Sequence, residues 1–478
     1  MRTLPTVVAY RLLGGAGATL LASAGLAAGA LPVGAHAAWW SALRQLAGPG
    51  LLCGYAGLTL LVAAWWWAGR DLRAAPSVER VAPSARPAAV RRSAALTLAC
   101  WAGPLLVAPP LFSRDAYSYL AQGAMVLADI DVYRHGVAQL GGALAGEVPQ
   151  MWQQTPAPYG PVFLAVAAVV SGLTGGKLVL GVLGLRLVAV AGVALLVAYL
   201  PRLARHCGVD PNAALWLGVL NPLVPLHLIA GAHNEAVMVG LLVAGLSLAF
   251  EHRYGAATVL VTLAALVKVP AVIGLLVVVS LAARHRGLPA SVARTAGFAA
   301  GTAAVVTWAT GIGYGWIGAL GTPMYRHSWS ISSGLGRLAS RASGRFGLHL
   351  GDTPMRFCLG LGVAAALAVA VVAWWRRRRL GPAYALGLVL VAVALLGPAT
   401  RPWYALWGLV LIAAAAPPGR CRAAAALGAV ILAFVALPSG FGPDAAQAAL
   451  AAAGVLVGAL AVGALRLLVP PVAVEVAR

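Results

Sequence analysis

LFSRDAYSYLAQG, residues 111–123, begins where an apolar run of about membrane-spanning length ends. The run covers Ser93 to Phe112, so Arg114 and Asp115 are predicted where a helix leaves the bilayer. A carboxylate at that boundary is placed for chemistry, although Asp before a polar helical stretch is also a common N-cap. The rest of the chain is interpreted as a membrane scaffold built around this acid.

The composition places the chain among polytopic membrane proteins. It has 478 residues, of which 61% are hydrophobic and 10% charged, whereas soluble domains carry about 25% charged residues. A net charge of +22 would suggest nucleic acid as the partner of a soluble domain, but here the basic residues fall mostly in short loops between apolar runs. That distribution favours a role in membrane topology, and no nucleic-acid partner is expected.

Hydropathy predicts an all-α bundle with about fourteen membrane segments. Their approximate ranges are 11–31, 50–69, 93–112, 178–200, 211–231, 235–250, 256–267, 270–283, 292–312, 355–375, 380–399, 403–417, 421–439 and 446–468. With this count every arginine cluster falls on one side, which the positive-inside rule makes the cytoplasm. Both termini are then cytoplasmic. The chain is expected to form a single multi-pass domain, residues 1–478, in the plasma membrane. The clusters lie in the linker 70–92, at Arg202 and Arg205, at Arg284 and Arg286, at Arg376 to Arg379, and at Arg420 with Arg422.

The outer face is predicted to carry two long loops, 113–177 and 312–354. The run Pro161 to Thr174 is about half a span long and is interpreted as an interfacial or re-entrant helix of the first loop. Two short segments, 256–267 and 270–283, are expected to form a hairpin of partial helices, because Pro270 cannot continue a helical ladder. This hairpin would bring Lys268 to the outer side, where an ammonium requires an anionic partner.

Polar residues converge on this outer face from five places in the chain. They are Asp115 with Arg114, Tyr159, the turn His233-Asn234-Glu235, Lys268, and Arg401 with Trp403 and Tyr404. Each has a plainer interpretation, such as a helix cap, a solvated turn, a snorkelling lysine or an aromatic belt. Their coincidence on one face indicates a site.

Weaker signals lie elsewhere in the outer loops. Asp129 and Asp131 could share a divalent cation if the backbone is not helical, although a solvated turn is the better interpretation. The arginines of the second loop could bind phosphate or an anionic glycan, and a segment facing lipid headgroups is equally compatible with them. These are Arg326, Arg337, Arg341 and Arg345.

The motifs together resemble the actinobacterial polyprenol-phosphate-mannose-dependent α-1,6-mannosyltransferases of the MptA/MptB type, and MptB more than MptA. These are glycosyltransferases of the GT-C class. The resemblance rests on SRDAYSY at 113–119 with Gln122-Gly123, on Asp131-Val132-Tyr133, TPAPYGP at 155–161, Asn221-Pro222-Leu223 and GAHNE at 231–235. The family more often has Asp-Pro-Tyr where this chain has Asp131-Val132-Tyr133, which weakens a metal or turn argument for Asp131.

The resemblance implies a GT-C-like bundle with its active site facing the periplasm. The enzyme would move mannose from polyprenyl (decaprenyl) phosphomannose to the α-1,6-mannan backbone of lipomannan and lipoarabinomannan in the cell envelope. Asp115 would be the base, with Lys268, Arg401 and His233 at the donor phosphate. Glu235, Asn234, Tyr159, Tyr117 and Trp403 would orient the acceptor. No cofactor is required, and a divalent metal is possible.

Two other functions remain open from the residues. A GT-C enzyme of the same kind could use lipid-linked arabinose or glucose, which the sequence hardly distinguishes from mannose. A lipid-glycan transporter or flippase also has many spans, but transporters usually show paired repeats and substrate sites near the midplane. Polar residues gathered on one face beside a long loop favour an enzyme.

Overall fold

The computed structural model describes residues 6–33, 38–74, 86–321, 328, 330–348, 350–438 and 444–468. Within these ranges the chain is helical and has no strand. Residues 75–85 of the predicted linker 70–92, and Arg326, lie outside them. So do residues 322–327, 329 and 349 of the second predicted loop.

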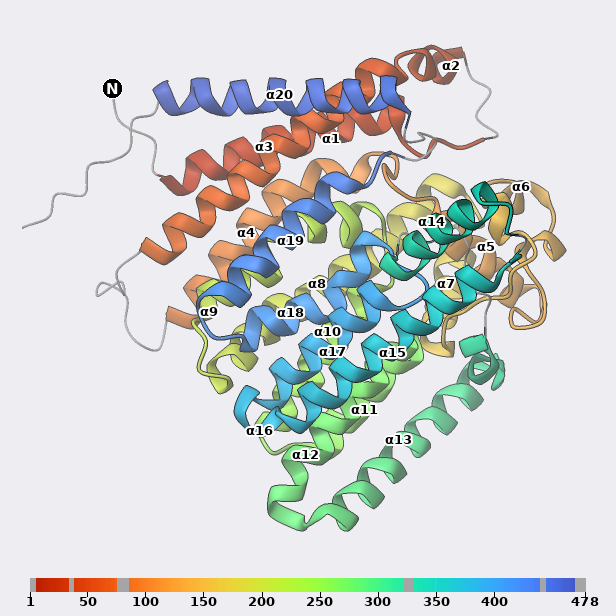
Figure 1. The fold of residues 1–478 in the computed structure, drawn as a ribbon, viewed down its shortest axis with the longest axis vertical. Coiled ribbons are helices and arrows are strands. Elements are labelled where there is room, and N and C mark those ends of the chain that lie inside the picture. Colours follow the sequence, from red (N-terminus) through yellow and green to blue (C-terminus); the bar gives the residue numbers. More distant parts are fainter. Residues whose placement is uncertain are drawn as a thin grey trace, which may run out of the picture.

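The described residues form twenty α-helices, joined in places by short 3₁₀ or π segments, and Figure 1 shows how these helices pack into a bundle. The first half of the chain forms α1 (Thr6–Ala28), α2 (Ala38–Gln45), α3 (Ala47–Ala74), α4 (Arg86–Val107), α5 (Asp115–Leu127), α6 (Gly142–Gly146), α7 (Pro161–Leu173), α8 (Leu178–His206), α9 (Pro211–Gly218), α10 (Glu235–Phe250) and α11 (Tyr254–Val267). The second half forms α12 (Gly274–Arg286), α13 (Leu288–Thr310), α14 (Ile331–Arg345), α15 (Thr353–Trp375), α16 (Arg377–Leu380), α17 (Pro382–Leu396), α18 (Leu406–Ala415), α19 (Arg420–Val435) and α20 (Ala445–Leu468).

Every one of the fourteen predicted segments contains a helix, but fewer helices meet the length of a membrane crossing. Six described helical stretches are long and apolar enough to cross a membrane. The number is seven if the bent pair Val224–Ala230 and Glu235–Phe250 forms one span. Some of the helices that do not qualify are short, such as α9, α11 and α18 with 8, 14 and 10 residues, whereas α4 and α13 are long enough but are not apolar enough. The protein is therefore membrane-embedded, with short helices in its core.

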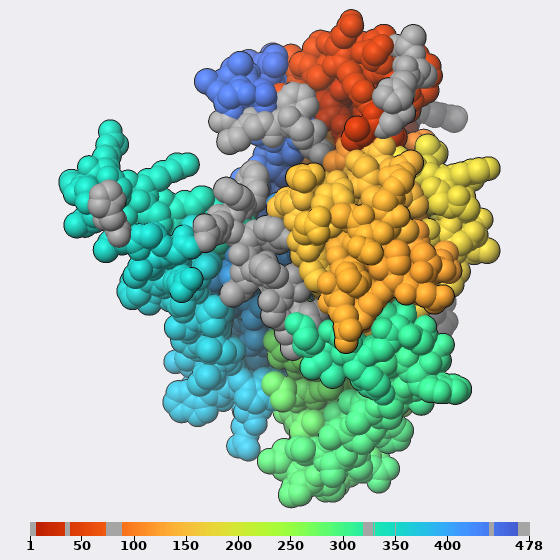
Figure 2. Space-filling model, turned by 90° about the vertical axis from the view of Figure 1, so that its right-hand side faces the viewer, coloured from red at the N-terminus to blue at the C-terminus, as the bar shows by residue number. Residues whose placement is uncertain are grey.

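The outer helices surround this core. Helix α1 packs on α3 and α4, α20 packs on α3, and α8 packs on α10. Close approach of α8 and α10 depends on Gly192 and Gly240, since a Cβ at either position would collide with the backbone of the other helix. Figure 2 shows the face formed by the segment from α5 to α7, with α14 to one side of it and the end of α13 below.

Two helix breaks at the same end of the bundle create irregular backbone there. A π-helical turn, η3 (Val224–Ala230), contains Pro225 and meets α10 at an angle of 110°. The turn between them holds Ala232 at a φ of 53°, which costs a non-glycine residue about 1–3 kcal/mol. The second break is at Lys268, which is extended between α11 and the 3₁₀ turn η4 (Val269–Ile273).

The predicted break at Lys268 and the hairpin around it are confirmed, but only α11 is a partial helix, since Val269–Arg286 is long and apolar enough to cross a membrane. The hydroxyl of Tyr254, at the start of α11, donates to the carbonyl of Leu281 near the end of α12. The two helices therefore run antiparallel, and their connection at Lys268 is the tip. A helix, α7, also forms in the segment predicted to be interfacial or re-entrant, and it packs against α5.

A buried arginine bridges helix ends near the first break. Arg186 of α8 is 2% exposed, and its guanidinium donates two hydrogen bonds to the carbonyl of Ala230, at 3.0 and 2.7 Å. A third, of 2.7 Å, goes to the carbonyl of Leu106 at the end of α4. Irregular backbone at membrane depth survives only when its polar groups are satisfied by protein, and Arg186 supplies these donors.

Replacing Arg186 by methionine should lower the Tm of the purified protein in detergent. Two buried carbonyls lose their donor, and each orphaned acceptor costs about 1–3 kcal/mol. Arg205→Met, at an exposed position near the end of the same helix, is the matched control and should leave the Tm nearly unchanged. Equal Tm values for both variants would show that Arg186 does not stabilise the break.

Candidate active site

Asp115 is the first residue of α5, directly after the N-cap residue Arg114. No side-chain cap hydrogen bond forms there, so the plainer interpretation of Asp115 as a helix cap does not describe the structure. Its backbone N–H donates to the hydroxyl oxygen of Ser113 at 3.0 Å, and its side chain is 22% exposed. The carboxylate is thus fixed in the first turn of a helix, where the helix dipole favours negative charge.

Opposing effects act on the pKa of Asp115. Burial raises the pKa above its ordinary value, while Arg401, the Ser113 hydroxyl and Lys268 each favour the carboxylate. Because Arg401 has the largest effect of the three, it is the main electrostatic partner of Asp115. A carboxylate with a raised pKa is a stronger base than an exposed one, which suits proton abstraction.

His233 lies beside this carboxylate. Its Nδ1 is 3.6 Å from Oδ2 of Asp115 and 3.4 Å from the hydroxyl of Tyr119. The imidazole stacks on the indole of Trp403, with ring centroids 3.8 Å apart and an angle of 19° between the planes. Tyr119 and Trp403 therefore hold the His233 ring in one orientation next to Asp115.

Lys268 and Glu235 form a buried ion pair that joins the two helix breaks. The side chain of Glu235 is fully buried and that of Lys268 is 12% exposed. The ammonium also lies 4.3 Å from the centroid of the Tyr404 ring, and 5.5 Å from those of Tyr159 and Trp407. The anionic partner expected for Lys268 is thus Glu235, and three aromatic rings complete the enclosure of the cation.

Arg401 differs from Lys268 in having no such partner. It is partly exposed, in extended backbone immediately before η6 (Pro402–Ala405). In the described ranges, no hydrogen bond or ion pair of its guanidinium is found. Its fork of donors is therefore ready for an anionic ligand near Asp115.

Several buried polar atoms around this cluster lack a partner among the described residues. They belong to the five neighbouring residues His233 (Nε2), Asn234 (both amide atoms), Glu235 (Oε2), Ser118 (Oγ) and Gln122 (Oε1). An unsatisfied buried polar group costs about 1–3 kcal/mol, and native structures keep few of them. Such a concentration in two short segments is typical of a site that binds a polar ligand.

Hydrogen bonds between two segments of the first outer loop fix the position of Tyr159. The hydroxyl of Tyr133 donates to the carbonyl of Tyr159 at 3.0 Å, and Ala157 donates to the carbonyl of Val132 at 2.8 Å. Asp131 accepts from the backbone N–H of Tyr133 at 2.9 Å and pairs with Arg134 at 3.3 Å. The two quoted motifs at 131–133 and 155–161 are therefore one structural unit.

The structure gives Asp129 and Asp131 no third ligand. Asp129 is an exposed turn residue with a φ of 54°, and Asp131 serves the local contacts just described. No group of three or more His, Cys, Asp or Glu residues that could hold a metal ion occurs in the part of the chain described above. Their plainer interpretation, a solvated turn, fits these contacts.

Tyr117 and the arginines of the second loop lie apart from these contacts. The Tyr117 hydroxyl donates to the carbonyl of Ala30 at 2.5 Å, beneath the guanidinium of Arg114. Orientation of the acceptor by Tyr117 stays a prediction, since this hydroxyl is already engaged. On α14, Arg337 donates to the carbonyl of Ser328 at 2.8 Å, while Arg341 and Arg345 are exposed.

Sequence reasoning missed three contributors to this region. Tyr119 lies in the opening stretch but was not singled out, and it contacts His233, Tyr159 and Phe163. His227 lies inside an apolar run, yet it is buried against Phe112 and Trp403 with both ring nitrogens unpartnered. Arg186 likewise sits inside an apolar span. A charged or polar residue within an apolar run was the available signal for the last two.

Comparison with known proteins gives a consistent picture. A family model described as "Alpha-(1->6)-mannopyranosyltransferase, N-terminal domain" matches residues 11–284, and one described as "MptB C-terminal domain" matches 332–467. The chain is 34% identical over 458 residues to a probable alpha-(1->6)-mannopyranosyltransferase of Mycolicibacterium smegmatis, covering 86% of this chain and 79% of that protein.

Two further relatives are named for the same activity. Alpha-(1->6)-mannopyranosyltransferase A of Mycobacterium tuberculosis is 35% identical over 435 residues, with 87% of this chain and 81% of the relative covered. Alpha-(1->6)-mannopyranosyltransferase B of Corynebacterium glutamicum is 35% identical over 451 residues, with 84% and 72% covered. No solved structure matches the chain.

Lys268→Met should strongly destabilise the protein, because it leaves the Glu235 carboxylate buried and unpaired. Breaking a buried ion pair from one side costs about 3–5 kcal/mol, whereas replacing both partners with apolar residues is often nearly neutral. The double variant Lys268→Met/Glu235→Leu should therefore regain much of the Tm lost in the single variant, measured in detergent. A double variant less stable than the single one would show that the pair is not the stabilising interaction.

Proposed function

Because the chain belongs to the MptA/MptB family of alpha-(1→6)-mannopyranosyltransferases, we propose that it transfers mannose from polyprenyl phosphomannose to a growing α-1,6-mannan. The acceptor is the mannan backbone of lipomannan and lipoarabinomannan, and the reaction takes place on the periplasmic face of the plasma membrane. The observation that carries this proposal is the position of His233, whose Nδ1 lies 3.6 Å from Oδ2 of Asp115 and whose ring stacks on Trp403. Trp403 follows two residues after Arg401, a cation that has no ion pair among the described residues.

The architecture supports this orientation. Helix α8 ends at Arg205 and His206, α12 ends at Arg284 to Arg286, and α18 begins just after Arg401 and ends near Arg420. The basic clusters therefore lie at the opposite helix ends from Asp115. With the basic end in the cytoplasm, we propose a GT-C-like bundle of fourteen membrane segments whose site faces outward and whose termini face inward.

The donor chemistry follows from that location. Nucleotide sugars are not expected outside the cytoplasm, so the sugar arrives on a lipid. A β-mannosyl phosphate that yields an α-linkage must react with inversion, by a single in-line displacement. The acceptor 6-oxygen forms a bond to the anomeric carbon while the bond from that carbon to the phosphate oxygen breaks.

Asp115 acts as the general base of this displacement and takes the proton of the attacking 6-hydroxyl. Such assistance contributes about 10²–10⁴-fold to a rate. The acid form is then returned to the carboxylate by loss of the proton to water. His233, held by Tyr119 and Trp403, orients Asp115 or donates a hydrogen bond to the donor phosphate.

The leaving polyprenyl phosphate takes the electron pair of the broken bond and gains negative charge, so it needs fixed cations close to it. Arg401 meets it directly, because no described acidic group is paired with its guanidinium. Lys268, already paired with Glu235, contributes a longer-range positive potential and holds the two breaks together. With the phosphate charge met in this way, we propose transfer without a divalent metal. The orphaned atoms of Asn234 and Glu235, with Tyr159, bind the acceptor sugar.

Asp115→Asn should reduce mannose transfer by about 10²-fold or more, because the amide cannot accept the hydroxyl proton. Membranes that express the variant are assayed with labelled polyprenyl phosphomannose and a short α-1,6-mannoside acceptor. Glu147→Gln, which changes a buried acid paired with Arg114, is the control for loss of an acid in the same loop. Full activity of Asp115→Asn at normal expression would remove the proposed base.

The pH profile gives a second readout of the same variant. Burial raises the pKa of Asp115, so the wild-type rate should fall as the pH drops through a value above the ordinary pKa of an aspartate, near 3.9. The residual rate of Asp115→Asn should lack that acidic limb. Activity of the wild type only with another lipid-linked sugar, arabinose or glucose, would reject mannose but keep the base.

Arg401→Ala should raise the KM for the lipid donor more than the KM for the acceptor, by about tenfold or more, since a charge-assisted contact to phosphate is lost. Arg401→Lys should recover part of the donor affinity, because it keeps the charge without the planar fork. Equal effects of Arg401→Ala on both substrates would indicate a structural role.

A further inference from the structure

The described part of the chain contains a cavity of about 800 Å³ at the end of the bundle opposite the site. It is lined by residues of α3, α9, α16, α17 and α19, of the turn between α8 and α9, and of the segment from the end of α18 to α19. Helix α18 separates the two regions, since it begins beside Trp403 and ends beside the cavity at Ala415. Its volume falls within the roughly 300–1,000 Å³ range of small-molecule sites.

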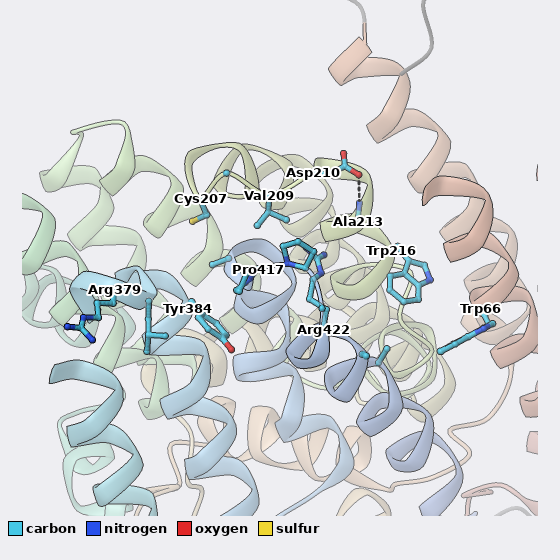
Figure 3. Close-up of a pocket in the computed structure, with 17 residues that line it drawn as sticks. Trp66, Cys207, Val209, Asp210, Ala213, Trp216, Arg379, Tyr384, Pro417 and Arg422 are labelled. Atoms are coloured by element: carbon cyan, nitrogen blue, oxygen red, sulfur yellow. Dashed lines mark hydrogen bonds between the residues drawn. The ribbon is translucent and has the colours of Figure 1, made fainter. Parts of the chain in front are cut away.

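The lining of the cavity is amphipathic, as Figure 3 shows. Trp66 and Trp216 form one end, Arg379 lies at the other, and Tyr384 and Arg422 lie between them. Trp216 is fixed by stacking on Trp65 at 4.8 Å and by a hydrogen bond to its carbonyl, whereas Trp66 is 38% exposed. An apolar wall of rigid rings therefore continues to the surface of the bundle.

The charge of this cavity is positive. Arg379 and Arg422 come from different elements, α16 and α19, and Arg422 is held in place by donating to the carbonyl of Ala413 at 3.1 Å. The one acid of the lining, Asp210, accepts from the backbone N–H groups of Asn212 and Ala213 and so caps its own helix. Its carboxylate is turned toward that helix end in Figure 3.

We propose that this cavity binds an anionic phospholipid from the leaflet at the basic end of the bundle. The lipid phosphate contacts Arg422, Arg379 adds positive charge at the edge of the cavity, and the glycerol and upper acyl chains pack against Trp66, Trp216 and Tyr384. Aromatic walls beside two arginines match a molecule with a charged head and an apolar body, and basic pockets between membrane helices are suited to anionic headgroups. The proposal does not depend on the transfer reaction.

The test uses the full chain in detergent and native mass spectrometry, with phosphatidylglycerol as the probe. Wild-type protein should retain about one phosphatidylglycerol per chain, in preference to phosphatidylcholine. Arg379→Gln/Arg422→Gln should weaken this binding by about tenfold or more, the loss expected for charge-assisted contacts to phosphate. Trp66→Ala should weaken it while leaving the charge intact.

The matched control is Arg378→Gln/Arg420→Gln, which removes two arginines next in sequence that do not line the cavity. It should bind phosphatidylglycerol like the wild type, with all Tm values compared in parallel. Equal loss in both double variants, or equal binding of phosphatidylcholine, would overturn the proposal. Competition by millimolar glycerol 3-phosphate as effective as by the lipid would also overturn it, because the site would then recognise a soluble phosphate.

Discussion

The buried ion pair between Lys268 and Glu235 is the interaction on which the site depends. Each residue stands at a break in the helical scaffold, one at the tip of the hairpin formed by α11 and α12, the other at the start of α10. Neither charge could remain buried alone at an acceptable cost. The pair therefore fixes two interruptions against each other, and the aromatic rings of Tyr159, Tyr404 and Trp407 close around it.

From this junction the arrangement of the reactive groups follows. The turn that ends at Glu235 also carries His233, which reaches Asp115 on α5, and Trp403 packs on the same imidazole. Arg186 secures the preceding π-helical turn by binding its last carbonyl. Helix breaks that are costly in a membrane are thus satisfied by two buried cations, while a third cation, Arg401, has no ion pair among the described residues.

Much of this was predictable from the sequence, for physical reasons. The lengths of the apolar runs predicted the helices, and Pro270 predicted the hairpin, because a proline has no backbone N–H to continue a helix. Both signals can be read from the local sequence. The convergence of Asp115, His233 and Lys268 followed from topology. The number of crossings stays a proposal, because helices such as α9 and α18 are shorter than a membrane crossing. The ion pairs were not predictable either, because nothing in the sequence near Lys268 shows that Glu235 neutralises it or that Arg401 has no ion pair within the described ranges.

The central claim is that Lys268 is neutralised by Glu235, whereas Arg401 binds the phosphate of the donor. Its most direct measurement is a cryo-EM structure of the full chain with an unreactive phosphonate analogue of polyprenyl phosphomannose. The account predicts density for the phosphonate against the Arg401 guanidinium, with the anomeric carbon beside the Asp115 carboxylate and the contact between Lys268 and Glu235 intact. A phosphonate bound to Lys268 with that pair broken, or bound at the opposite end of the bundle, would contradict it.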